Sequence, residues 1–247
     1  MKYIKYWIIP VVLLVLMVFC CNQFSYYRGM MQQAEYKEAD LAEQVQEAYD
    51  DALYEDTTGL LRYDVFKSSE NYAIHELKSG EQVLHINVGF GSLDRGLKNI
   101  NDTYGHINGR HAIMDFAELL KEVFPENQFV ICHRGGSAFL VYGVGSFTTD
   151  DILGYYEALK TKWHDTTYQV WDGTGSVDGM ALLFLADSTP DNGMSFKTLK
   201  NTLVYKKLAL RDVTNCGYVI MTGKDTYISS VEIDESQYLE SKNADIN

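Results

Sequence analysis

The chain has 247 residues, which suffices for one ordinary domain with an appendage or for two small domains. Its formal net charge of −13 would repel a phosphate backbone over most of the surface, which argues against general nucleic-acid binding. Hydrophobic residues at 46%, aromatic residues at 13% and only 3 prolines exclude a disordered or low-complexity chain. We therefore expect most of the chain to fold around a core.

An uncharged apolar run near the N-terminus predicts a membrane anchor. Residues 6–21 read YWIIPVVLLVLMVFCC, and no pattern of small residues typical of a signal-peptide cleavage site follows them. We expect a charged flank over 1–5 and an uncleaved, single-pass anchor over 6–24 in the cell membrane. Lysines before the anchor favour an N-terminus inside the cell, whereas Arg28 and Lys37 behind it weaken that bias. The side of the membrane on which the remaining chain lies stays open.

A connecting helix is predicted over 25–55. Residues 31–56 hold nine acids and one base, with no glycine or proline. A thin apolar seam with heptad-like spacing runs along the segment and would allow pairing with a second copy of the chain in a homodimer. A solvated single helix is the equally weighted alternative. The seam consists of Ala34, Leu41, Val45, Ala48 and Ala52.

Helical and strand patterns alternate after the connecting helix, which predicts an α/β domain over 56–231 with a polar tail over 232–247. The expected fold is a mixed central β-sheet flanked by helices. A Gly-Gly pair between two apolar runs is a strong hairpin signal at 135–136. Strand patterns cover 82–90, 129–132, 138–142, 180–185, 217–221 and 226–231, and helical patterns cover 109–123, 151–163 and 196–210.

The four cysteines form neither a disulfide framework nor a CxxC zinc motif. Cys20 and Cys21 are adjacent in the apolar run, and the other two stand alone. We expect Cys132 and Cys216 to be ordinary, partly buried thiols. A bridge between them is the alternative, and it requires that the domain lie outside the reducing cytosol.

Three segments carry a family resemblance through their order and spacing. Residues 56–60 (DTTGL), followed by Phe66, are similar to the opening D-x-L-T-G-L-x-N-R-x-x-F of the GGDEF domain family. Residues 97–106 (LKNINDTYGH), with Gly109 three positions on, are similar to F-K-x-I-N-D-x-x-G-H-x-x-G-D. Residues 134–139 (RGGSAF) stand where R-Y-G-G-D-E-F belongs. The chain thus resembles the diguanylate cyclases, which make cyclic di-GMP from two GTP on a palm-like nucleotidyl-cyclase fold.

The resemblance also indicates that the catalytic metal ligands are missing. The family reaction, attack of a 3′-hydroxyl on an α-phosphate, needs Mg²⁺ held by carboxylates. The two carboxylate positions fall on Leu93 and Ser137, and the second acid of the turn is replaced by Ala138. Asp94 is one residue out of register, so it would point to the opposite face of a regular strand. We therefore expect no catalytic residue, no metal ligand and no cyclase activity.

A vestigial nucleotide site is implied by the positions that remain. Asn101 matches the family asparagine that binds guanine, and Lys98 matches a lysine near the phosphates. The acid that would accept from the guanine edge is Arg110, which has only donors and would weaken guanine binding. The expected vestigial residues are Lys98, Asn101, Asp102, Gly135, Gly136 and Ser137.

Other family sites are replaced as well. The phosphate-binding lysine of the last helix falls on Leu208, with Lys206 and Lys207 out of register, and the R-x-x-D product-inhibition motif falls on 126–129 (ENQF). No HExxH motif or nucleophile elbow is present. We expect His106 and His111 to be a turn and a helix-surface histidine and not metal ligands.

These observations predict a membrane-anchored, degenerate GGDEF-domain protein that serves cyclic di-GMP signalling as a nucleotide-sensing or protein-interaction module. We expect no cofactor, with Mg²⁺ and GTP bound together only if the site is active. A guanine nucleotide and a cyclase or phosphodiesterase are the expected partners. Two alternatives stay open: an active cyclase that uses Asp94 as an atypical metal ligand, and an extracytoplasmic structural or signalling domain that binds no nucleotide.

Overall fold

The computed structural model describes residues 4–91, 96–188, 216–223 and 226–230, with the backbone alone for 4–11, 222–223 and 226–227. The predictions for Leu93, Asp94, the helix over 196–210 and the polar tail lie outside these residues. The chain divides into two compact units, residues 1–52 and residues 53–247.

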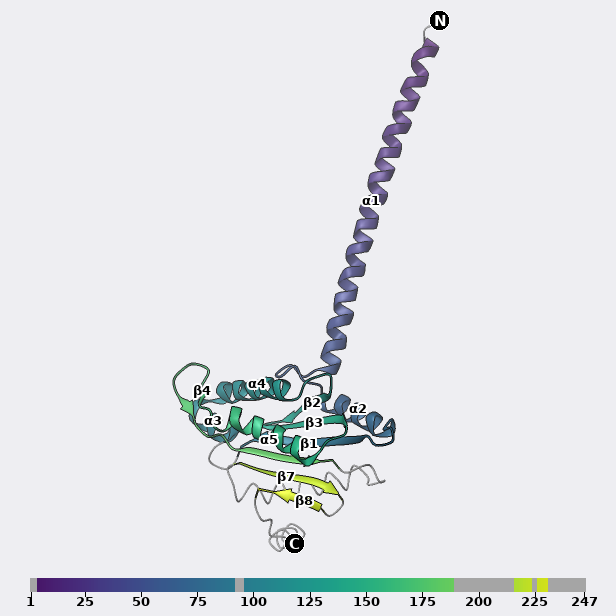
Figure 1. Ribbon diagram of the computed structural model, residues 1–247. Helices are drawn as coiled ribbons and strands as arrows, with labels where there is room; N and C mark the ends of the chain where they lie inside the picture. The colour runs from purple at the N-terminus through teal and green to yellow at the C-terminus, as the bar shows by residue number, and fades with distance from the viewer. Residues whose placement is uncertain (1–3, 92–95, 189–215, 224–225, 231–247) are drawn as a thin grey trace, which may run out of the picture. The chain divides into compact units, whose positions relative to one another are not determined.

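The first unit is a single long helix, α1 (Ile4–Leu53) (Figure 1). It is continuous through the predicted anchor and the predicted connecting helix. Exposed i,i+4 hydrogen bonds such as Gln44 Nε2 to Asp40 (2.9 Å) support its polar part. Leu41 and Val45 of the seam are exposed. Within the residues described, no helix combines the length and the apolar character needed to cross a membrane.

The second unit is built on a six-stranded sheet with the strand order β2-β3-β1-β6-β7-β8. All neighbouring strands are antiparallel except β6 and β7, which are parallel, so the predicted mixed sheet is confirmed. A separate two-stranded hairpin pairs β4 (Tyr168–Gln169) with β5 (Ser176–Val177). The sheet strands are β1 (Gln82–Phe90), β2 (Phe129–Gly135), β3 (Ala138–Gly145), β6 (Leu182–Asp187), β7 (Cys216–Gly223) and β8 (Thr226–Ser229).

The main core lies between one face of the sheet and two helices, α4 (His106–Val123) and α5 (Thr149–Trp163). Alternate residues of β1 face these helices, as the strand pattern over 82–90 predicts. Phe116 on α4 lies at the centre of this core, because its ring contacts three other aromatic rings. The ring centroids of Phe90, Phe139 and Trp163 lie 5.0, 5.2 and 4.8 Å from that of Phe116.

The other face of the sheet is covered in part by α2 (Tyr63–His75), a helix absent from the sequence predictions. Phe66 packs its ring edge-on against Tyr142 of β3 at 5.2 Å. β1 places His85 and Asn87 on this face, and both are buried. The second face therefore holds a polar strip beside an apolar cluster.

A second helix missing from the sequence predictions is α3 (Leu97–Tyr104), which runs directly into α4. The predicted helices over 109–123 and 151–163 begin earlier, at His106 and Thr149. The strand predicted over 180–185 instead covers Leu182–Asp187. These changes at the element ends leave the predicted layer arrangement unchanged.

Candidate functional site

The Gly-Gly turn between β2 and β3 lies against the end of β1. Gly135 and Gly136 have φ values of 118° and 59°, a region that favours glycine. The carbonyl of Ser137 accepts a hydrogen bond from Phe90 N (3.2 Å). A side-chain carbon at Gly89 would lie 2.5 Å from the same carbonyl, so β1 can approach the turn this closely only with glycine there.

Ser137 brings its hydroxyl to the point where β1 ends and α3 begins. A side-chain carbon built at Gly91 would lie 3.6 Å from Ser137 Oγ and 3.8 Å from the backbone nitrogen of Leu97, the first residue of α3. Three segments therefore meet here: the end of β1, the first turn of α3 and the hairpin turn. The hairpin turn offers the hydroxyl of Ser137 and the methyl group of Ala138.

The side chains described at this turn do not fit a magnesium site. Mg²⁺ is held in proteins through carboxylates and waters, and a hydroxyl with a methyl group supplies no negative charge. In the described part of the chain, no group of three or more His, Cys, Asp or Glu side chains could hold a metal ion. Leu93 and Asp94, the other positions predicted to matter for metal binding, lie outside that part.

Asn101 is fixed by close packing between α3 and α4. A side-chain carbon at Gly109 would overlap the Oδ1 atom of Asn101, so the amide rests directly on the α4 backbone. The buried Asn108 stabilises the same junction, because its Nδ2 donates to Tyr104 O (2.7 Å) and its Oδ1 accepts from Trp171 N (2.8 Å). The predicted guanine-binding amide thus lies at the packed junction of α3 and α4.

Lys98 and Asp102 lie one turn apart on the exposed side of α3 and form an ion pair, with 2.6 Å between Lys98 Nζ and Asp102 Oδ2. The hydrogen bond and negative charge of Asp102 raise the pKa of Lys98 above its ordinary value. Both side chains are exposed, so the ion pair is open to exchange with a bound anion. The structure thus pairs two of the predicted nucleotide-site residues with each other.

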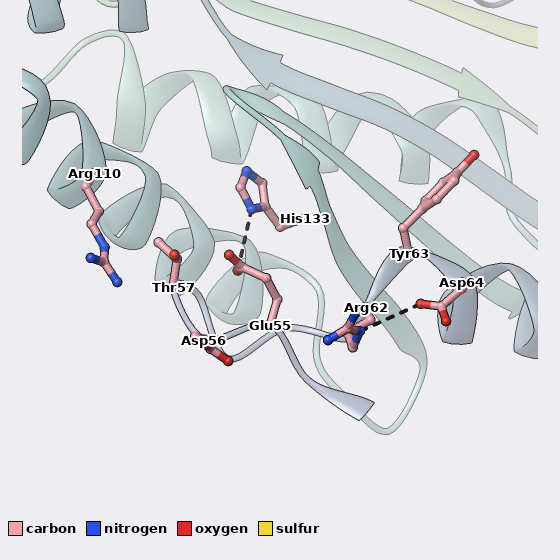
Figure 2. A pocket seen from close by; sticks show the side chains of 8 residues that line it. All are labelled: Glu55, Asp56, Thr57, Arg62, Tyr63, Asp64, Arg110 and His133. Atoms are coloured by element: carbon pink, nitrogen blue, oxygen red, sulfur yellow. Dashed lines mark ion pairs between the residues drawn. The ribbon is translucent and has the colours of Figure 1, made fainter. Parts of the chain in front are cut away.

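Arg110 lines a pocket of about 680 Å³ whose other residues come mainly from the segment that follows α1 (Figure 2). In Figure 2 the guanidinium group of Arg110 points towards the turn that holds Asp56 and Thr57. Acidic and basic side chains share the lining, so the pocket has no single charge sign. It is lined by Glu55, Asp56, Thr57, Arg62, Tyr63, Asp64, Arg110 and His133.

Glu55 and His133 form a contact that the sequence motifs do not indicate. Glu55 Oε2 lies 3.5 Å from His133 Nδ1 and accepts hydrogen bonds from Thr58 N (3.0 Å) and Thr58 Oγ1 (2.7 Å). Burial alone would raise the pKa of Glu55, but hydrogen bonds from Thr58 and Thr57 and the charge of His133 lower it below its ordinary value. Glu55 therefore stays ionised at neutral pH.

Each residue of this contact lies one position before a motif that the sequence analysis names. Glu55 immediately precedes the DTTGL segment, and His133 immediately precedes the RGGSAF segment. Glu55 closes the 55–60 turn in two ways: its carboxylate accepts from Thr58 N (3.0 Å), and its backbone carbonyl accepts from Gly59 N (2.8 Å). Asp56 is exposed beside it.

Burial and stacking place several other residues that the sequence analysis names, whereas Lys206, Lys207 and Leu208 lie outside the described residues. His111 stacks on Trp171 with ring centroids 4.8 Å apart. In the segment that replaces the product-inhibition motif, Glu126 is exposed and Phe129 is a core residue. Cys132 and Cys216 are separate free thiols, and burial raises the pKa of Cys132 to about 12.

No protein-family model matches the chain, and no curated protein sequence matches it. Several solved structures, by contrast, are similar to the fold of this chain. The coiled coil and GGDEF domain of DgcB from Caulobacter crescentus, in complex with c-di-GMP, gives a TM-score of 0.63 at 16% identity over 80% of this chain and 98% of that one. The GGDEF domain of TpbB (YfiN) from Pseudomonas aeruginosa gives 0.60 at 16% identity over 76% and 99%.

A third similar structure is a two-protein complex. Diguanylate cyclase SiaD from Pseudomonas aeruginosa, in complex with its activator SiaC, gives a TM-score of 0.56 at 15% identity over 84% of this chain and 76% of that one. Identities this low establish a shared fold and leave the chemistry to the residues of this chain.

Proposed function

Since the chain has the fold of GGDEF domains, we propose that it is a degenerate form of that domain, which serves cyclic di-GMP signalling without making cyclic di-GMP. The observation that carries the proposal is the turn beside β1 and α3, where Ser137 and Ala138 supply no carboxylate. Loss of metal ligands costs several kcal/mol of transition-state stabilisation, and about 1.4 kcal/mol is already a tenfold change in rate.

The direct test is cyclic di-GMP formation by the full chain, solubilised in detergent and supplied with GTP and Mg²⁺. We expect no product above the level of a reaction without protein. Product formation would overturn the proposal in favour of the active cyclase with atypical ligands. In that case Asp94→Ala should abolish the activity, because Asp94 is the acid nearest in sequence to the missing ligand.

The retained residues support binding of a guanine nucleotide without turnover. Asn101 packs against Gly109, and Lys98 is exposed and forms its ion pair with Asp102 among the residues that the structure describes. A triphosphate carries more negative charge than one carboxylate, so it would compete for Lys98. We propose that the domain senses nucleotide through these two side chains.

Calorimetric titration of GTP into the solubilised full chain tests this binding. We expect saturable binding of GTP. In Asn101→Ala the affinity should fall about threefold to tenfold, because one hydrogen bond to the nucleotide is lost. The matched control is Asn99→Ala on the same helix, which should bind as the unchanged protein does. Equal affinity in both variants would contradict the assigned role of Asn101.

The domain would also act by binding a partner protein. The similar SiaD structure contains an activator protein, so a domain of this fold is found with a regulatory partner. We propose a partner cyclase or phosphodiesterase for this chain. If GTP does not bind, the interaction with such a partner becomes the function to test.

We further propose that residues 6–24 anchor the chain in the cell membrane. The proposal rests on the uncharged sequence of this segment and on the continuous helix α1 that contains it. A reporter enzyme fused after residue 247 and assayed on each side of the membrane tests the anchor and its orientation. Activity only outside the cytosol would favour the extracytoplasmic alternative, and a reporter found wholly in the soluble fraction would contradict the anchor.

A further inference from the structure

The apolar seam of α1 is longer than residues 34–52 alone. Counting back from Ala34 in alternating steps of three and four residues reaches Met31, Tyr27 and Phe24. Figure 1 shows α1 unbroken over this range, so these side chains lie along one stripe of a single helix. We name this stripe the extended seam, and it consists of Phe24, Tyr27, Met31, Ala34, Glu38, Leu41, Val45, Ala48 and Ala52.

The large apolar side chains of the extended seam are exposed. Phe24 is 70% exposed and Met31 is 66% exposed, and Leu41 and Val45 are exposed to a similar degree. The side-chain hydrogen bonds described within α1, from Gln44 to Asp40 and from Gln46 to Asp50, lie outside the stripe. The stripe is about 40 Å long at the rise of an α-helix, and a second copy of the chain carries the matching stripe.

The residue types of the extended seam favour two parallel helices. In a heptad repeat with positions a to g, the 3-4 spacing puts Leu41 at position d and Val45 at position a. A β-branched residue at position a with leucine at position d favours a parallel, two-stranded coiled coil. In such a dimer each seam residue lies beside the same residue of the other copy. The extended seam therefore fits α1 of a second copy.

Glu38 is the one charged residue in the extended seam. It occupies an a position, so the parallel dimer brings two carboxylates together at its axis. Ion pairs within a helix form between residues three or four positions apart. At these distances from Glu38 the chain has only Ala34, Glu35, Leu41 and Ala42. The helix that carries Glu38 thus offers it no cation.

Lys37 is the nearest cation in the sequence, and it fits Glu38 of the other copy. Adjacent residues do not face each other on a helix, so Lys37 does not face Glu38 of its own chain. The acid one turn further on, Asp40, accepts a hydrogen bond from Gln44. Among the described residues, Lys37 and Glu38 have no hydrogen bond or ion pair. In a parallel dimer, Lys37 occupies position g, which flanks position a of the partner helix.

We propose that the extended seam binds a second copy of the chain, and that Glu38, paired with Lys37 of the other copy, sets the register of this coiled coil. A slipped register would place each carboxylate against apolar side chains and away from the lysine of the other copy. The charged layer therefore fixes which residues meet, and it lowers the affinity of the dimer. The pairing requires no nucleotide, so it stands independently of the proposed function.

Sedimentation equilibrium of the full chain in detergent tests the role of Glu38. Glu38→Val should tighten the dimer about tenfold, because an apolar layer replaces a charged layer in the interface. The matched control is Glu43→Val, which makes the same exchange at position f on the outward side of the helix. It should dimerise with the affinity of the unchanged protein. Equal or weaker dimerisation of Glu38→Val would overturn the proposal.

A double-mutant cycle tests the pairing of Lys37 with Glu38. Lys37→Gln should weaken the dimer about threefold to fivefold, because the two carboxylates then lose their cations. In the Glu38→Val background, the same Lys37→Gln change should have no effect on the affinity. An equal effect of Lys37→Gln in both backgrounds would show that the two residues do not interact and would overturn the pairing.

The two adjacent cysteines of α1 report the register and the direction of the helices. Cys20 lies four residues before Phe24 and continues the seam at position d, whereas Cys21 lies beside the seam at position e, and both are exposed. Oxidation of the solubilised chain by copper phenanthroline should give a disulfide-linked dimer. The cross-link should persist in Cys21→Ser and be lost in Cys20→Ser. Absence of the cross-link, or equal cross-linking in both variants, would contradict the parallel, in-register seam.

Discussion

At the scale of single residues, Gly109 shows how this chain positions the amide of Asn101. Glycine is normally unfavourable inside a helix, by about 1 kcal/mol relative to alanine. Here it lets the side chain of Asn101 rest on the α4 backbone, where a side-chain carbon would overlap Oδ1. The site position of Asn101 therefore depends on a residue that itself has no polar side chain.

Gly109→Ala should accordingly destabilise the protein although it improves helix propensity. Overpacking costs about 1–3 kcal/mol, which exceeds the propensity gain, so we expect a loss of about 1 kcal/mol in the free energy of unfolding. The control is Gly154→Ala in α5, where nothing lies within 4 Å of the added carbon, and it should stabilise by up to about 1 kcal/mol. Urea unfolding of both variants measures the two effects, and a stabilising Gly109→Ala would refute the close packing.

Individual positions also show what can and cannot be predicted from one sequence. The turn at Gly135 and Gly136 could be predicted, because it lies in a short local motif, whereas the role of Asn101 stays a prediction. The contact of Glu55 with His133 could not, because it joins positions far apart in the chain and nothing local requires it. The position of Arg110 beside residues 55–64 likewise depends on how α4 packs against that segment.

At the scale of elements, α5 shows why one helix begins before its apolar pattern does. Thr148 and Asp151 form a capping box, in which Thr148 Oγ1 accepts from Asp151 N and the Asp151 carboxylate accepts from Thr148 N (2.8 Å). Hydrogen bonds from the side chain and backbone of Thr148 lower the pKa of Asp151. The stabilisation from this carboxylate is therefore present at neutral pH and is lost as the pH falls through the lowered pKa.

Removal of this cap should destabilise α5. For Thr148→Ala we expect a loss of about 1 kcal/mol, the usual cost of replacing an N-cap residue. The control is Thr161→Ala, an exposed position in the same helix, which should be neutral or slightly stabilising. Thermal unfolding measures both variants, and equal melting temperatures would show that the capping box contributes nothing.

The helices that escaped prediction are those with little apolar burial. α2 buries only Phe66 and Glu70, so a charged residue occupies one of its two inward positions. α3 has eight residues and buries only Ile100. By contrast, β1, β2 and β3 show a clear period because whole faces of these strands enter the core. Prediction therefore succeeds where burial is extensive.

At the scale of the whole molecule, the polar part of α1 is long, acidic and exposed. Its thin seam would bury apolar side chains only against another helix, so we expect a parallel dimer through this helix. Val45→Asp should convert the dimer into a monomer by placing a charge at a seam position. Ala39→Asp adds the same charge outside the seam and should leave the dimer intact. Analytical ultracentrifugation of both variants decides, and an unchanged dimer in Val45→Asp would exclude this seam.

The strand order has a consequence for the way the protein is made. The central strand β1 is synthesised first among the sheet strands, yet its partners come much later: Ile86 pairs with Val141 and Ala186. The β2–β3 hairpin joins neighbouring segments and can form early. By contrast, β1 has no partner on one edge until β3 has been synthesised, and none on the other until β6 has been synthesised. We therefore expect slow folding, and we expect β1 to be the segment of the nascent chain that chaperones must protect from aggregation.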